Sequence, residues 1–218
     1  MSGRLLVINP NSSVEVTKGI DRAMTPLRTP TGPAIDVVRI AEGPPGIETQ
    51  QDVESVVPLI VRRVREDNDA AAYVIACFSD PGLYAAREAA QRPVFGIAEC
   101  GILTALTLGA RFGLISILRK VIPRHIRFLG AMGVMDRFAG DRAIDLKVTE
   151  LADENTTFAR MAAVGTELRE RNGADVLVMA CAGMAEYRAR LADTLGIPVV
   201  EPTQAAAAMA LGRIALGW

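Results

Sequence analysis

Short apolar runs alternate along the chain with longer segments in which apolar residues recur at helical spacing. Eight runs have the length and the β-branched or apolar content of strands: Leu5–Ile8, Ile35–Arg39, Ala72–Ala76, Val94–Ile97, Phe112–Ser116, Asp145–Val148, Val176–Ala180 and Val199–Val200. Between two of these runs, Val53, Val57, Ile60 and Val64 are spaced as in an amphipathic helix. The alternation predicts βαβ units, with parallel strands and helices on both faces of the sheet.

The two halves of the chain resemble each other. Residues 65–77 align with residues 169–181 at an offset of 104 positions, and seven of the thirteen pairs are identical. Residues 4–9 match residues 111–116 at an offset of 107. A period of about half the chain predicts two similar lobes rather than a solenoid.

We therefore predict an α/β fold of two pseudo-symmetric lobes, each a parallel sheet flanked by helices, with an active site in the cleft between them. The first lobe is assigned to residues 1–105 and the second to residues 106–218. The apolar segment 205–218 is expected to be a docking helix, on the first lobe or at the subunit interface of a homo-oligomer. Ligands of such sheets bind beyond the carboxyl ends of the strands, so chemistry is expected in the residues that follow them.

Composition and charge exclude several classes of partner. Half of the residues are hydrophobic, 22% are charged and the formal net charge is −1, with no long run of one sign. Neither nucleic acid nor an anionic membrane is therefore expected as a partner. The apolar run at Leu5–Ile8 is too short for a signal-peptide core, and no later stretch has the length of a membrane span. Three cysteines, an odd number, favour the reducing cytoplasm over a disulfide framework.

Two of these cysteines, Cys77 and Cys181, occupy equivalent positions, each at the end of a repeated strand. A cysteine in an apolar strand is more often an inert small hydrophobe, but the paired placement favours a function. If a helix begins after each following turn, its N-terminal amides would lower the thiol pKa and donate to an oxyanion. Cys100 has no counterpart in the repeat and is taken as structural.

Metal and cofactor chemistry is not indicated. The sequence has no CxxC or Cys–His metal spacing, and neither a Walker-type nor a GxGxxG loop. A Cys–His nucleophilic pair is disfavoured as well, although His125, the only histidine, can approach a cysteine in three dimensions. We expect a small-molecule ligand and no cofactor.

Several segments resemble hydantoin racemases, which belong with their allantoin racemase relatives to the aspartate/glutamate racemase superfamily. These segments span nearly the whole chain: residues 8–13, 46–49, 76–83, 93–99 and 180–184. The two cysteine motifs are specific in combination, whereas Asn9-Pro10-Asn11 alone would be weak. The resemblance implies a cofactor-independent racemase or epimerase, in which one thiolate removes a proton α to a carbonyl and the other thiol reprotonates the opposite face. A 5-substituted hydantoin or a related amino-acid derivative is the implied substrate.

The implied enolate needs hydrogen-bond donors. Candidates are the side chains of Asn9, its repeat counterpart Ser116, Ser13 and Ser79, and the backbone amides of Phe78, Ala182 and Gly183. Ser13 equally suits the N-cap of the helix expected there.

A basic cluster follows the strand that ends at Ser116. It consists of Arg119, Lys120, Arg124 and Arg127. The default for such a cluster is a solvated face, and one member, Arg119 first, is a candidate for binding a substrate carboxylate. The chain departs from the family here, because Ser116-Ile117 stands where hydantoin racemases carry a Thr-Thr-like pair. This change, with Phe78 and Met184, favours a less polar substituent on the substrate.

Three other functions stay open at this point. Arylmalonate decarboxylase, of the same superfamily, would imply a single thiol in the second lobe, and the presence of Cys77 argues against it. Maleate cis–trans isomerase keeps two cysteines. A non-enzymatic small-molecule binding protein also fits a two-lobed α/β chain, but such a protein has no need for paired thiols.

Overall fold

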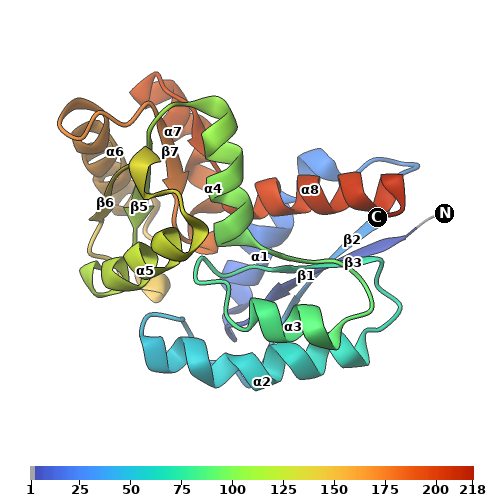
Figure 1. Ribbon diagram of the computed structural model, residues 1–218. Helices are drawn as coiled ribbons and strands as arrows, with labels where there is room; N and C mark the ends of the chain where they lie inside the picture. Colours follow the sequence, from blue (N-terminus) through green and yellow to red (C-terminus); the bar gives the residue numbers. More distant parts are fainter. Residues whose placement is uncertain (1–2) are drawn as a thin grey trace.

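The computed structural model describes residues 3–218, which form two four-stranded parallel sheets (Figure 1). The first sheet has the strand order β2-β1-β3-β4 and the second the order β6-β5-β7-β8. The strands are β1 (Arg4–Asn9), β2 (Ala34–Arg39), β3 (Ala72–Ile75), β4 (Val94–Gly96), β5 (Phe112–Ser116), β6 (Phe138–Ala143), β7 (Val176–Met179) and β8 (Val199–Val200). The equal strand orders confirm the predicted α/β fold of two similar lobes.

The helices repeat in the same way. Those of the first lobe are α1 (Val14–Ala23), α2 (Gln50–Glu66), α3 (Leu83–Ala89) and α4 (Ile97–Leu108). Those of the second are α5 (Ile122–Met132), α6 (Glu154–Glu170), α7 (Arg188–Leu195) and α8 (Pro202–Leu216). Short 3-10 segments lie at Thr25–Leu27, Arg119–Val121, Met135–Arg137, Val148–Glu150 and Ala182–Tyr187. Within residues 3–218, no helix is both long and apolar enough to span a bilayer.

The central strands of each sheet, β1 and β3 in the first and β5 and β7 in the second, are buried on both faces, as is usual for parallel strands. Along β1, Leu5 and Val7 enter a core that runs between the lobes, whereas Leu6 and Ile8 pack beneath α2 and α3. The period of two in the strand explains this division. α2 begins with a capping box, in which the Thr49 side chain accepts from the amide of Asp52 and the Asp52 carboxylate accepts from that of Thr49.

The last helix of each lobe crosses to the other lobe. α4 follows β4 of the first sheet but packs against β5, β7 and β8 of the second. α8 follows β8 and packs against β1, β3 and β4 of the first sheet, and the two helices also pack on each other (Figure 1). The division expected after residue 105 falls inside α4. The crossing joins both sheets through one apolar core, which fixes how their strand ends face each other.

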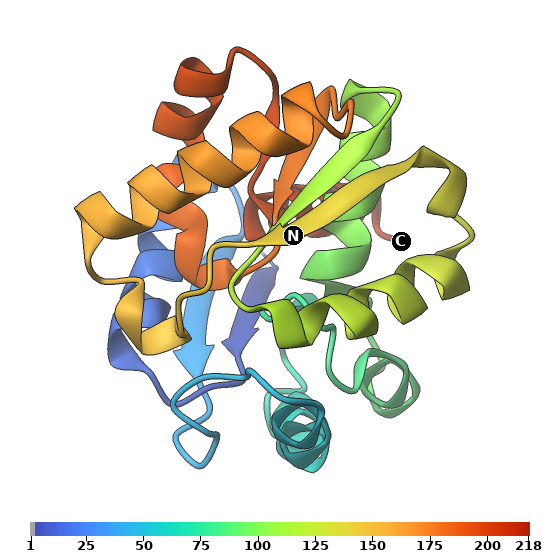
Figure 2. The same cartoon turned by 90° about the vertical axis from the view of Figure 1, so that its left-hand side faces the viewer.

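One strand prediction was wrong. The segment Asp145–Val148 is not a strand: Asp145 has a left-handed backbone with φ 53°, and a 3-10 turn begins at Val148. Ile144 and Leu146 are apolar because their side chains pack into the core of the second lobe. The actual edge strand, β6, has the sequence FAGDRA, whose polar residues hid it. Figure 2 shows this strand with α6 and α5 on either side of it.

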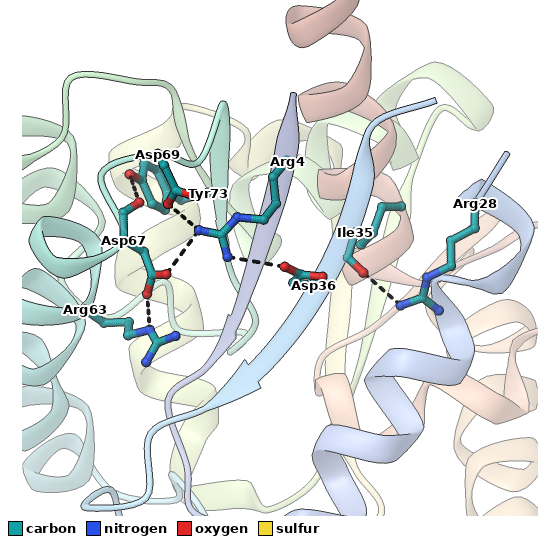
Figure 3. Close-up of polar contacts among 8 residues, drawn as sticks. All are labelled: Arg4, Arg28, Ile35, Asp36, Arg63, Asp67, Asp69 and Tyr73. Atoms are coloured by element: carbon teal, nitrogen blue, oxygen red, sulfur yellow. Dashed lines mark hydrogen bonds and ion pairs between the residues drawn. The ribbon is translucent and has the colours of Figure 1, made fainter. Parts of the chain in front are cut away.

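An ionic network stabilises the amino-terminal end of the first sheet (Figure 3). Cys77 lies at the opposite end of this sheet, beyond the carboxyl end of β3. The guanidinium of Arg4 on β1 lies 3.2 Å from Asp36 on β2, 3.1 Å from Asp67 and 2.5 Å from Asp69. The Tyr73 hydroxyl donates to the Asp67 carbonyl oxygen over 2.7 Å. The network ties β1, β2 and the loop before β3 together, and it has a structural role.

Candidate active site

The two cysteines that end the repeated strands come together in one cavity. Cys77 lies two residues beyond β3 and Cys181 two residues beyond β7, and both line the same pocket between the lobes. The other lining residues come from both lobes: Asn11, Val16, Ile47, Ala76, Phe78, Ser79, Ile117, Val121, Arg124, His125, Val148, Ala180, Ala182 and Gly183. Four expected residues, Phe78, Ser79, Ala182 and Gly183, are therefore brought to the cysteines, whereas Met184 is fully buried outside the cavity.

The cavity is narrow in this structure. Its volume is about 40 Å³, whereas small-molecule sites measure roughly 300–1,000 Å³. Two loops from different lobes approach each other beside it, since the Glu48 carboxylate accepts from the Val148 amide over 3.1 Å and lies 3.5 Å from the Lys120 ammonium. A Cβ atom on Gly46 would lie 2.8 Å from the Val148 Cβ, so only glycine permits this approach. Because Ile47 and Val148 of these loops line the cavity, we expect the loops to separate when a ligand binds.

Both cavity thiols are protonated at neutral pH. Burial raises the pKa of Cys77 to about 12; the nearby Cys181 raises it further, while Arg124 and the Ser79 amide act in the opposite direction. Burial also raises the pKa of Cys181 to about 11 against the lowering effect of the Gly183 amide. The amides expected to lower the thiol pKa are thus present, but loss of hydration outweighs them. A thiolate here needs a proton acceptor or a bound ligand that changes the environment.

Asn9 does not line the cavity; it positions Asn11, which does. The Asn9 side chain is fully buried and its Nδ2 donates to the Asn11 Oδ1 over 3.0 Å. The Ser13 amide donates to the same oxygen over 2.9 Å. With its oxygen held twice, Asn11 has its Nδ2 amide left for a ligand. Ser13 itself caps α1, since its hydroxyl accepts from the Val16 amide. In the Asn9-Pro10-Asn11 motif, Asn9, at the end of the strand, was predicted from the sequence as the site residue, and Asn11 was not.

Ser116 lies behind the cavity wall in a buried triad. Its hydroxyl donates to one oxygen of Asp141 over 2.5 Å, and the other oxygen lies 2.7 Å from the Nδ1 of His125. His125 does line the cavity, with its ring edge-on to Phe78 at 5.4 Å between centroids. The fold thus brings His125, the only histidine, into the same cavity as the two cysteines. The spacing of these residues in the sequence had disfavoured a Cys–His pair. No sequence signal pointed to Asp141, since it lies on the strand that was misplaced.

Among the basic cluster, Arg124 and not Arg119 reaches the cavity. The Arg119 side chain is 82% exposed and pairs with Asp145 at 3.1 Å. Arg124 lines the cavity, and its buried Nε has no hydrogen-bond partner among residues 3–218. Burial lowers the pKa of Arg124 while Cys77 acts to raise it, as expected of a cation close to that thiol. From the sequence, a solvated face was the default expectation for Arg124. Helical spacing alone does not reveal how α5 lies relative to the cleft, so it could not predict that Arg124 lines the cavity.

The charged groups nearest the cavity do not form a metal site. Residues 3–218 contain no group of three or more His, Cys, Asp or Glu side chains placed to hold a metal ion. Asp80 follows the first cysteine but serves the neighbouring helix: its carboxylate accepts from the amides of Ala98 and Glu99 at 2.9 Å each, at the start of α4. Cys100 is buried inside α4, outside the cavity.

Comparison with known proteins places this arrangement in a family. Residues 5–210 match the family described as Asp/Glu/Hydantoin racemase. This chain belongs to the Asp/Glu/hydantoin racemase family. It is 36% identical to a hydantoin racemase of Paenarthrobacter aurescens over 99% of this chain and 92% of the relative. It is 32% identical to a hydantoin racemase of a Pseudomonas species over 98% of this chain and 87% of the relative.

A solved structure extends the comparison. An allantoin racemase from Klebsiella pneumoniae superposes with a TM-score of 0.91 at 34% identity, covering 99% of this chain and 89% of that one. The resemblance seen in the sequence motifs is confirmed, and so is an enzyme of the isomerase class. The cavity of this racemase is thus the place to seek its proton-transfer groups.

Proposed function

We propose that this racemase inverts a carbon α to a carbonyl by a two-base mechanism that uses Cys77 and Cys181, without a cofactor. The observation that carries the proposal is the presence of both cysteines, one from each lobe, in the wall of one cavity. One thiolate takes the proton from the stereogenic carbon, and the electron pair of that C–H bond moves into the carbonyl as an enolate. The thiol of the other lobe donates its proton to the opposite face of that carbon and becomes a thiolate. A pair of such groups avoids return of the proton to the face it left.

Donors around the cavity stabilise the enolate oxygen as its charge develops. We assign this role to the Asn11 amide, oriented through Asn9, and to the backbone amides that follow each cysteine. Arg124, in place of Arg119, which the sequence favoured, supplies the positive charge. Because its buried Nε has no partner among residues 3–218, an anionic oxygen or the Cys77 thiolate is the natural counter-charge.

A 5-substituted hydantoin or a related amino-acid derivative is the proposed substrate class. The relatives at 32–36% identity are named hydantoin racemases, and the superposed solved structure is an allantoin racemase. The cavity walls Val16, Ile117, Val121 and Val148 are apolar, which suits an aliphatic or aromatic substituent over a charged one.

The test is loss of optical activity from single enantiomers. We expect 5-alkyl and 5-aryl-methyl hydantoins to racemise with this protein, faster than allantoin and the free amino acids. Maleate and arylmalonates are included, because turnover of either without any racemisation would assign the chain to the isomerase or decarboxylase chemistry of its superfamily. If a ligand protects the cysteines from alkylation but no compound is turned over, the result would favour a binding protein.

A further inference from the structure

The two cavity thiols share a difficulty that the two-cysteine scheme leaves unsolved. Burial keeps both protonated at neutral pH, and the scheme, on which this inference rests, needs one of them as a thiolate. A carboxylate–imidazole pair is built into the wall beside them. Asp141 lies 2.7 Å from the Nδ1 of His125, and both side chains are almost completely removed from solvent.

We propose that His125, held by Asp141, is the acid–base group that takes the proton of the Cys77 thiol. The Asp141 carboxylate only accepts, so Nδ1 must carry its hydrogen, and neutral His125 then has its lone pair on Nε2. The transfer forms an N–H bond at Nε2 and breaks the S–H bond of Cys77. It yields a thiolate and an imidazolium, whose charge the Asp141 carboxylate balances. No other reactant is consumed.

Three observations assign Cys77 as the partner. His125 packs edge-on against Phe78, the residue next to Cys77. Arg124, the residue before His125, is the cation that acts on the Cys77 thiol and lowers its pKa. Both arginine and histidine line the cavity with Cys77. Arg124 acts on the Cys77 thiol and is not among the groups that shift the pKa of Cys181, so the Arg124-His125 segment is assigned to Cys77.

The position of His125 also connects the cavity with solvent. A second pocket, of about 250 Å³, adjoins the cavity that holds the cysteines. The two share four lining residues: Phe78, Ser79, Arg124 and His125. After each turnover the cysteine that acted as the base is protonated and the other is a thiolate. Before the same enantiomer can react again, the first cysteine must lose a proton and the second must gain one. His125 is placed to exchange that proton with water in the second pocket while the narrow cavity stays filled.

Charged and titratable groups on several elements surround His125. Asp141 faces it from β6, Arg124 lies beside it on α5, and Cys77 and Cys181 face it across the cavity. From the second pocket Glu54 on α2, Asp80 and Arg127 complete its surroundings. Among these groups, Asp141 is the charged group hydrogen-bonded to the imidazole, at 2.7 Å from its Nδ1.

The single histidine makes a direct test practical. In ¹⁵N-labelled protein without added histidines, long-range ¹H–¹⁵N NMR reports the tautomer and titration of His125 alone. We expect the Nδ1–H tautomer near neutral pH, and a titration curve that changes in Cys77→Ser but not in Cys100→Ala. An Nε2–H tautomer, or identical titrations in wild type and Cys77→Ser, would overturn the assignment.

Alkylation gives a second reading that needs no substrate. His125→Gln should slow the reaction of Cys77 with iodoacetamide at pH 7 by about 10²-fold, in the range of general-base effects. Near pH 11 to 12 the wild-type and variant rates should converge, which a merely structural loss would not produce. Unchanged alkylation in a folded His125→Gln protein would contradict the proposal. Because neither measurement involves turnover, either can fail while racemisation stands, and racemisation can fail while both succeed.

Discussion

Cys77 and Cys181 line one cavity although they follow strands of two different sheets, β3 and β7. The relationship follows from the internal duplication, because equivalent strand ends meet when two copies of one lobe face each other. The crossed helices α4 and α8 hold that arrangement through a shared apolar core. Two equivalent thiols on one substrate are what inversion in both directions requires.

The first prediction concerns the thiols themselves. Cys77→Ser and Cys181→Ser should each lower racemisation by about 10²–10⁴-fold, since a hydroxyl is a far weaker acid than a thiol and does not ionise to provide the anionic base. The matched control is Cys100→Ala, which removes the buried cysteine of α4 and should keep most of the activity. Polarimetry on purified variants measures the effect. Full activity in both serine variants would rule out the two-base scheme.

A second prediction separates Arg124 from its neighbours. Arg124→Gln should lower kcat/KM by about 10–100-fold, the value of a hydrogen bond to a charged group. It should also move the alkylation profile of Cys77 to higher pH, because the guanidinium lowers the pKa of that thiol. Arg119→Ala is the control, since that side chain is 82% exposed. Equal losses in the two variants would assign the effect to overall charge.

Much of this architecture was predictable from the sequence, and the exceptions have physical causes. Seven strands followed from local apolar runs, and the offset between the cysteine motifs revealed the paired lobes. β6 was missed because an edge strand is not buried on both faces, so its residues carry charge. Arg124 and His125 could not be placed, since their approach to Cys77 depends on how α5 crosses the cleft. That crossing is a property of the packed lobes and leaves no local pattern.

The third prediction uses the buried carboxylate of Asp80. Burial raises its pKa to about 7 from an ordinary value of 3.8, although two amides at the start of α4 act to lower it. The folded state therefore holds this proton more tightly than the unfolded state. Its stabilising contribution is complete below pH 4 and disappears as the pH rises through 7. Wild type should lose up to about 4 kcal/mol of unfolding free energy relative to Asp80→Asn over that interval.

Denaturant unfolding of both proteins between pH 4 and pH 8 measures this difference. The comparison with Asp80→Asn removes the contributions of all other titrating groups, which the two proteins share. Parallel stability profiles would mean that Asp80 ionises normally in the fold.

A fourth prediction addresses admission to the narrow cavity. Gly46→Ala would place a Cβ atom 2.8 Å from that of Val148, which pushes apart the two loops that Glu48 bridges. We expect faster alkylation of Cys77 and Cys181 at a fixed pH, because the cavity opens more often. Gly130→Ala, where a Cβ atom meets nothing within 4 Å, is the matched control and should react like wild type. Slower or unchanged alkylation in Gly46→Ala would place the route of admission elsewhere.

Deuterium placement tests the two-base claim most directly. One enantiomer of a 5-alkyl hydantoin is incubated in D₂O with wild-type protein, stopped early in turnover and resolved on a chiral column, with the uncatalysed exchange measured in parallel. The account predicts that the newly formed enantiomer carries deuterium at the stereocentre while the remaining starting enantiomer keeps its proton, because different thiols serve the two faces. Equal deuterium in both enantiomers from the start, or a product that retains the original proton, would contradict it and indicate a single base.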